Sequence, residues 1–169
     1  ADMGMQVRAG QTIETGPAGL VEIVFDDRNV FQLRESSTLQ LDIGSDRTRS
    51  VSLERGAFAA VFDRLRQVTG DTAFEFRAPS AVGGVRGTTF YVSVEDERTT
   101  YVCTCNGATD LDGRDDGAER TVDTGYHRAY RFIQDGGTVR VESAPLVYHT
   151  DAEMEALAAK VGATIPWDR

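Results

Sequence analysis

Short runs of alternating apolar and polar residues, separated by turn-forming residues, recur through the first ninety residues. Because successive side chains of a β-strand point to opposite faces, each such run can bury one face of a strand. Gly16-Pro17 and Gly56 are among the residues that favour turns between the runs. The pattern predicts an all-β sandwich, barrel or solenoid and argues against βαβ units. The clearest runs are Leu20–Phe25, Val30–Leu33, Thr38–Ile43, Val51–Leu53 and Ala73–Phe76.

The stretch from Ala57 to Val68 fits this alternation less clearly. Its apolar residues Phe58, Val61, Phe62 and Leu65 have a spacing closer to that of a helix. The sequence leaves this stretch as either a strand or a helix.

The length and composition of the chain indicate the number of domains and whether it can span a membrane. A chain of 169 residues, 40% of them hydrophobic, can bury one good core, so a single domain over residues 1–169 is expected. No apolar run reaches the ~20 residues that a membrane-spanning helix needs, so this chain is not expected to span a membrane, although the full-length protein can be anchored. The opening Ala1-Asp2-Met3 is typical either of a mature product whose signal or anchor has been removed or of a trimmed chain.

The charge pattern narrows the classes of partner. The net charge is −9, and the basic residues are scattered instead of gathered into a patch that could neutralise phosphates. No nucleic-acid partner is therefore expected. Lys160 is the sole lysine, and neither a nucleophile-elbow motif nor a zinc-protease motif is present. The sequence does not indicate an enzyme.

Two segments have a distinctive spacing of glycine, apolar and aromatic residues. The first comprises Gly10, Ile13, Thr15, Gly16, Gly19, Val21, Ile23, Phe25, Asp26 and Asp27. The second comprises Phe74, Phe76, Pro79, Ala81, Gly83, Arg86, Gly87, Thr88, Phe90 and Val92. These segments resemble the opening and the later signature of the FecR-like domain family. The resemblance covers about residues 8–113, which leaves residues 114–169 as a C-terminal extension.

The resemblance implies both a fold and a compartment. FecR-like domains are extracytoplasmic β modules, often the sensing or relay part of a membrane-anchored regulator of iron uptake. By this resemblance the chain is expected in the periplasm or elsewhere outside the cytoplasm of a bacterial envelope. Its expected partner is an envelope protein.

The C-terminal extension shows a hairpin and then a helix. Two strands, Arg128–Ile133 and Thr138–Glu142, are joined by Asp135-Gly136-Gly137. Thr150 and Glu153 form a capping-box pattern that predicts a short helix closed by Gly162. The expected fold is therefore all-β, mainly antiparallel and sandwich-like or solenoid-like, with one short C-terminal helix.

The two cysteines of the chain, Cys103 and Cys105, lie two positions apart in a predicted strand, Thr99–Cys105. This strand is expected to end in a hairpin turn at Asn106-Gly107. Both thiols project from one face, so both sulfurs can reach one small object, and a shared ligand is favoured. A disulfide ranks second, because a bridge between positions i and i+2 fits poorly with preferred disulfide geometry. The third alternative is a pair of inert, buried thiols.

The two histidines, His127 and His149, lie at the boundaries of predicted elements, where side chains can converge without disturbing a core. Together with Cys103 and Cys105 they make a complete set of ligands for a four-coordinate metal. The alternative is that both histidines are plain surface residues. The four residues are the candidate metal ligands of this sequence.

Two metal centres fit this set of ligands. A single zinc or iron ion with two thiolates and two imidazoles would be structural. In a Rieske-type [2Fe–2S] cluster, one iron takes two cysteines and the other takes two histidines, which would support electron transfer or redox sensing with a redox partner. The iron-linked family resemblance favours the [2Fe–2S] cluster. A structural zinc site, or a metal-free β scaffold that binds a partner, is the alternative.

Overall fold

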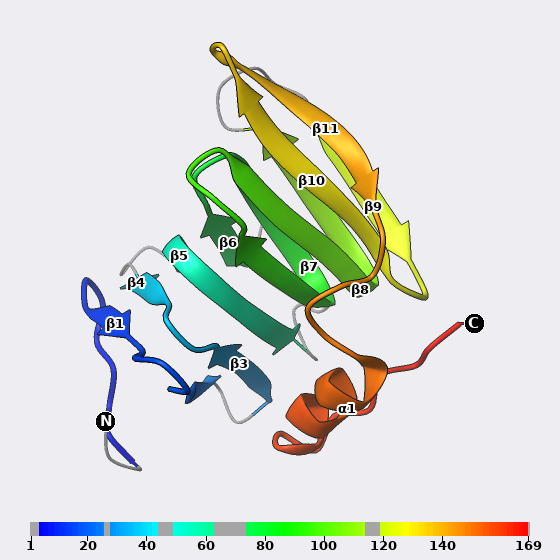
Figure 1. Ribbon diagram of the computed structural model, residues 1–169. Coiled ribbons are helices and arrows are strands. Elements are labelled where there is room, and N and C mark those ends of the chain that lie inside the picture. Colours follow the sequence, from blue (N-terminus) through cyan, green and yellow to red (C-terminus); the bar gives the residue numbers. More distant parts are fainter. Residues whose placement is uncertain (1–3, 26–27, 44–48, 63–73, 114–118, 169) are drawn as a thin grey trace.

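The computed structural model describes residues 4–25, 28–43, 49–62, 74–113 and 119–168. These residues form a mainly antiparallel β fold with one short helix (Figure 1), as the sequence predicts. The strands are β1 (Thr12–Glu14), β2 (Val21–Phe25), β3 (Asn29–Leu33), β4 (Thr38–Ile43), β5 (Arg49–Phe62), β6 (Phe74–Arg77), β7 (Ala81–Val94), β8 (Thr99–Gly113), β9 (Arg120–Thr124), β10 (Arg128–Asp135) and β11 (Thr138–Ala144), and the helix is α1 (Asp151–Ala159).

Three long neighbouring strands, β5, β7 and β8, hold the fold together because each changes partners halfway along its length (Figure 1). The first half of β5 pairs with β4 and β6, and its second half pairs with β3 and β7. Similarly, β8 pairs with β10 along its first half and with β9 along its second. The pairings therefore divide one continuous sheet into two layers that share these three strands.

A glycine with a left-handed backbone marks the point where each shared strand changes layer. Gly56 in β5, Gly87 in β7 and Gly107 in β8 have φ values of 82°, 64° and 103°. Glycine adopts this conformation without the steric cost that a Cβ would impose. The sequence-based prediction of a hairpin turn at Asn106-Gly107 is wrong, because β8 continues through these residues to Gly113 and only bends there.

The main core lies between the two layers and consists largely of phenylalanine rings. Phe58 and Phe90 from one layer contact Phe76 from the other, with ring centroids 6.2 and 5.5 Å apart. Phe31 and Phe74 make a further contact between the layers at 6.5 Å. All five rings are almost fully buried. Burial of aromatic surface on this scale is the main stabilising contribution that such a sandwich offers.

The stretch that the sequence left open between strand and helix is a strand as far as Phe62, and residues 63–68 lie outside the described residues. Phe58 and Phe62 belong to the core between the layers, whereas Ala59 and Val61 belong to a second apolar cluster on the outer face. Because both faces of this half of β5 are buried, both carry apolar residues. The polar alternation that identifies a half-buried strand is therefore missing.

The second apolar cluster lies on the outer face of the layer that contains β3 and the second half of β5. Helix α1 packs on these two strands and contributes Met154, Leu157 and Ala158 to the cluster. The helix begins as predicted, with Thr150 and Glu153 forming a capping box. Its packing holds the C-terminal segment against the sheet (Figure 1).

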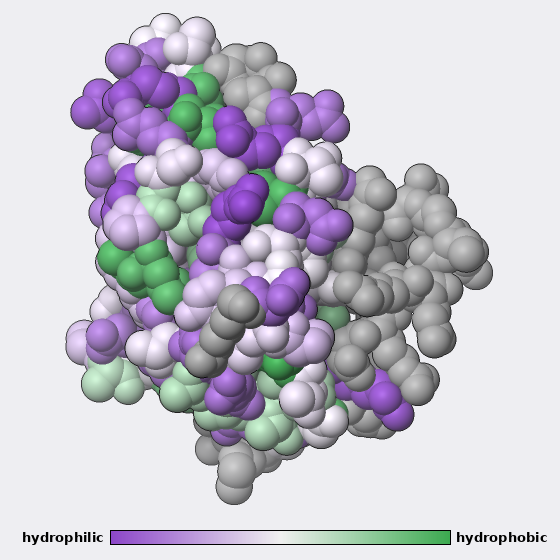
Figure 2. Space-filling model, turned by 90° about the vertical axis from the view of Figure 1, so that its right-hand side faces the viewer, coloured by the Kyte–Doolittle hydropathy of each residue, from purple (hydrophilic) through white to green (hydrophobic). Residues whose placement is uncertain are grey.

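The predicted C-terminal hairpin is present as β10 and β11 and extends the sheet beyond β8. The side of the molecule seen in Figure 2 is largely hydrophilic, with small separate hydrophobic areas. In the described part of the chain, no helix has the length and apolar character needed to cross a membrane.

The bend at Gly56 gives a first testable prediction. A Cβ added there would lie 2.5 Å from Cα of Ser37, in addition to adopting a positive φ. Gly137, in the β10–β11 turn, also has a positive φ but has nothing within 4 Å of an added Cβ. We expect Gly137→Ala to lower the free energy of unfolding by about 1 kcal/mol and Gly56→Ala to lower it by at least about 3 kcal/mol. Urea denaturation of both variants measures the difference, and equal losses would show that the close approach to Ser37 has no importance.

Candidate metal centre

Cys103 and Cys105 lie on the outer face of the sheet, in the half of β8 that pairs with β10. Thr104, which lies between them, and Val102, which precedes Cys103, project to the other face. Val102 joins the core between the layers. Both cysteines belong to the second apolar cluster and have no exposed surface. The period of two along β8 therefore directs both sulfurs toward the segment that covers this face.

The two histidines reach the same place from different parts of the chain. His127 directly precedes β10, which pairs with β8, so that Ala129 lies opposite Cys103. His149 directly precedes Thr150, the N-cap of α1. The β10 pairing fixes the first imidazole, and the docked helix fixes the second. His149 is 5% exposed and the side chain of His127 is 3% exposed.

The four predicted ligands converge. The two Sγ atoms are 3.8 Å apart, Cys103 Sγ lies 3.5 Å from His127 Nδ1, and Cys105 Sγ lies 3.3 Å from His149 Nε2. One ligand atom from each residue lies within 4.8 Å of each of the others. The structure thus brings together all four residues that the sequence singled out, and they can hold a metal ion.

Three of the six distances between the ligand atoms fit the edges of a tetrahedron around one ion, and all six are within 4.8 Å. At a tetrahedral zinc ion, bonds of about 2.3 Å to sulfur and about 2.0–2.1 Å to nitrogen place two sulfurs about 3.8 Å apart and a sulfur and a nitrogen about 3.6 Å apart. The observed sulfur–sulfur distance is 3.8 Å, and the two shorter sulfur–nitrogen distances are 3.5 and 3.3 Å. Each value is within about 0.3 Å of the expected edge.

The ring nitrogen of each histidine that faces away from the sulfurs also has a partner. His127 Nε2 lies 2.8 Å from Oδ1 of Asp151, and His149 Nδ1 lies 3.1 Å from the carbonyl oxygen of Val147. Metal-binding histidines commonly donate their second N–H group to a carboxylate or a backbone carbonyl, which fixes the tautomer and the ring orientation. In this arrangement, Nδ1 of His127 and Nε2 of His149 are the nitrogens that face the thiols.

Aromatic rings enclose both imidazoles. The indole of Trp167 stacks on His127 with ring centroids 4.9 Å apart, and the phenol of Tyr91 stacks on His149 at 4.5 Å. The Trp167 indole N–H also donates to Glu155 on α1. These contacts exclude water from the four ligands and limit their movement.

The two thiols differ in acidity because of their surroundings. The hydrogen bond from Cys105, together with those of His127 and His149, lowers the pKa of Cys103 to about 4 although burial opposes the shift. Burial raises the pKa of Cys105 well above its usual value, and the neighbouring Cys103 adds to this effect. Burial acts to lower the pKa of His127, but Cys103 and Asp151 outweigh it, so this pKa is raised. The surroundings thus favour deprotonation of Cys103 over deprotonation of Cys105.

Two other uses of the cluster fit the geometry less well. Both cysteines are free thiols, and their 3.8 Å separation is well beyond the ~2.05 Å of a disulfide. Cys103 also contacts His127, and His127 contacts Asp151, in the order found in a Cys–His–Asp catalytic triad. Cys103 has no exposed surface, however, and a nucleophile needs access to its substrate.

Sequence reasoning missed the residues that support the four ligands. Asp151 lies between the capping-box residues Thr150 and Glu153 and has no metal-site signal of its own, and the carbonyl group of Val147 carries no sequence signal. The position of Asp151, two residues after His149, was the one available hint. Its partner is the other histidine, His127, which lies 24 positions away in the chain. Only the folded chain, which places the first turn of α1 next to the segment before β10, brings the two together.

Comparisons with known proteins agree with the fold. The profile of the family described as FecR protein matches residues 11–108. Two crystal structures of a candidate anti-sigma factor from Parabacteroides distasonis, at 1.65 and 2.50 Å resolution, are each similar with a TM-score of 0.58 and 14% sequence identity. Each match covers 79% of this chain and 59% of the other, so this sequence spans less than two thirds of that protein. A search of curated proteins found no significant match.

The supporting role of Asp151 can be tested by substitution. We expect Asp151→Ala to weaken metal binding by about 10- to 100-fold, because His127 loses the group that orients its ring. Asp123→Ala, which removes an exposed carboxylate from β9, is the matched control and should leave the affinity unchanged. Competition with a chromophoric chelator measures both affinities. An unchanged affinity in Asp151→Ala would contradict the proposed role.

Proposed function

We propose that this chain, which belongs to the FecR protein family, is an extracytoplasmic interaction module whose C-terminal segment is fixed to its sheet by one structural zinc ion. The observation that carries the proposal is the convergence of Cys103, Cys105, His127 and His149, with ligand atoms within 4.8 Å of one another. The partners of both outward-facing ring nitrogens support it further.

The distances favour one metal ion over the [2Fe–2S] cluster that the sequence favoured. In a Rieske-type cluster the cysteines bind one iron and the histidines bind the other, so each sulfur is separated from each imidazole nitrogen by the width of the cluster. In this site, Cys103 lies 3.5 Å from His127 and Cys105 lies 3.3 Å from His149. These contacts leave no room for two bridged iron atoms between the pairs. Electron transfer and a redox partner are therefore not supported.

The ligand set and its surroundings favour a structural zinc ion in particular. Tetrahedral coordination by two thiolates and two imidazoles is typical of zinc, whereas catalytic zinc sites keep a position open for water or substrate. Here four protein ligands complete the coordination, and Trp167 and Tyr91 cover the imidazoles. The proposed ion stabilises the fold and has no catalytic function.

The proposed ion joins three segments that are distant in sequence. Strand β8 supplies the two cysteines, the segment before β10 supplies His127, and the segment before α1 supplies His149. A bound ion holds the C-terminal segment on the outer face of the sheet in addition to the contacts of α1.

The wider role of the module follows from its family. FecR proteins are associated with envelope signalling, and the similar crystal structures are of a candidate anti-sigma factor. We therefore propose that the partner of this chain is another protein of the bacterial envelope, and that the chain lies in the periplasm or elsewhere outside the cytoplasm. We also propose that residues 1–169 form a single domain, because β10 and β11 of the extension continue the sheet of residues 8–113.

A metal assay with substitutions tests the proposed site. We expect the purified protein to be colourless and to contain one zinc ion per chain. Cys103→Ser and Cys105→Ser should each lose the ion but keep a β-rich circular dichroism spectrum, because the phenylalanine core between the layers does not depend on the site. Unchanged metal content in both variants would contradict the assigned ligands. A visible absorption spectrum that bleaches on reduction would instead indicate an iron–sulfur cluster.

Removal of the ion tests its structural role. A bound ligand stabilises the native state by about 4 kcal/mol at a thousand times its dissociation constant. For a chain of this length, each kcal/mol shifts the melting temperature by about 2–4 °C. We therefore expect a strong chelator to lower the melting temperature by roughly 10 °C, and added zinc to restore it. If the chelator removes the zinc but the melting temperature stays the same, the ion does not stabilise the fold.

A further inference from the structure

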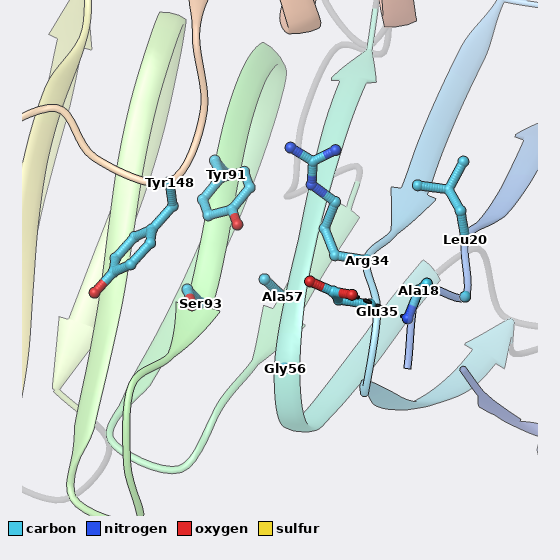
Figure 3. Close-up of a pocket in the computed structure, with 10 residues that line it drawn as sticks. Ala18, Leu20, Arg34, Glu35, Gly56, Ala57, Tyr91, Ser93 and Tyr148 are labelled. Carbon is cyan, nitrogen blue, oxygen red and sulfur yellow. Dashed lines mark hydrogen bonds between the residues drawn. The ribbon is translucent and has the colours of Figure 1, made fainter. Parts of the chain in front are cut away.

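A pocket lies on the same outer face of the sheet, beside the C-terminal segment (Figure 3). Its volume is about 570 Å³, within the range of small-molecule binding sites. None of the four candidate metal ligands lines it. The residues that determine its chemistry are Leu20, Arg34, Glu35, Tyr91, Ser93 and Tyr148.

Two opposite walls of the pocket leave large apolar groups in contact with solvent. Leu20 is 52% exposed and Tyr148 is 49% exposed, and Figure 3 shows them on opposite sides of the pocket. They are two of the six large hydrophobic residues that are exposed among the described residues. Two exposed apolar groups that face the same cavity indicate a ligand with an apolar body.

The Tyr148 wall is held in a strained conformation. Its φ is 70°, which is uncommon for a residue with a bulky side chain. Its hydroxyl group donates to Glu95 at 2.6 Å, and its ring packs edge-on against Tyr101. The surroundings therefore fix a backbone conformation that Tyr148 would not adopt by preference. Such strain is commonly found at functional sites.

The pocket also has one charge of each sign, from consecutive residues. The guanidinium of Arg34 is held by Glu153 at 2.6 Å and by Gln32 at 3.0 Å, and a carboxylate oxygen of Glu35 accepts the N–H of Ala18 at 2.9 Å. In Figure 3 the guanidinium and the carboxylate lie apart from each other, both between Tyr91 and Leu20. A ligand with a single charge can pair with only one of these two groups. A ligand with two separated, opposite charges can pair with both groups.

We propose that this pocket binds a short apolar peptide with free termini. The terminal carboxylate pairs with Arg34, the terminal ammonium pairs with Glu35, and the apolar side chains lie between Leu20 and Tyr148. Separated charges favour a peptide over a single amino acid, whose two charges are close together. This inference goes beyond the proposed structural zinc ion and does not depend on it.

Calorimetric titration of the full chain, as purified, with the dipeptide leucyl-leucine tests the proposal. We expect a dissociation constant of about 1 mM or tighter. N-acetyl-leucyl-leucinamide, which has the same side chains but neither charge, should bind at least about tenfold more weakly, because the paired charges are lost. Absence of binding by leucyl-leucine, or equal binding of the two compounds, would overturn the proposal.

Substitutions locate the binding site and separate its charges. Leu20→Ser should weaken the binding of leucyl-leucine, whereas Leu146→Ser, which changes a leucine that is 40% exposed outside the pocket, should not. Glu35→Gln should weaken the binding of leucyl-leucine but not that of N-acetyl-leucyl-leucine, which lacks the ammonium group. Equal effects of the two leucine substitutions, or equal effects of Glu35→Gln on the two peptides, would contradict the assigned contacts. Circular dichroism of each variant verifies that it is folded.

Discussion

The alternation of side chains along β8 is the constraint on which both the fold and the candidate metal centre depend. Because β8 lies in the middle of a layer that is covered on both sides, each of its faces must be buried. One face supplies Val102 to the phenylalanine-rich core, and the other supplies Cys103 and Cys105 to the cluster under the C-terminal segment. A shift of one residue in the pairing of β8 with β10 would exchange these faces and separate the thiols from both histidines.

The outer face is completed by the part of the chain that follows the family match. The family match ends at residue 108, directly after the bend at Gly107, and both histidines follow it. The segments before β10 and before α1 therefore supply half of the proposed ligands, and α1 covers the outer face on which the cysteines lie. Two of the described pairings, those of β8 with β9 and of β8 with β10, join this extension to the sheet, and β11 pairs in turn with β10. The proposed ion adds a link where the pairings end.

Much of this arrangement could be predicted from the sequence, because alternation and capping are local signals. The strand Thr38–Ile43 and the start of α1 at its Thr150 cap were predicted correctly. The hairpin turn at Asn106-Gly107 was not, because a pair that favours a turn can also form a bend within a continuous strand. Only part of the long strand β5 could be predicted, because burial on both faces removes the alternation of apolar and polar residues. The four candidate ligands could be named because they are the two cysteines and the two histidines of the chain. The role of Asp151 could not be predicted, because it depends on a contact that only the folded chain makes.

X-ray absorption spectroscopy of the purified protein tests the central claim most directly, because it reports the element, the ligands and any neighbouring metal together. The account predicts a zinc edge with two sulfur ligands at about 2.3 Å and two nitrogen ligands at about 2.0–2.1 Å. It also predicts no scattering from a second metal atom. An iron edge with iron–iron scattering, or a protein without a stoichiometric metal, would contradict the single tetrahedral ion held by Cys103, Cys105, His127 and His149.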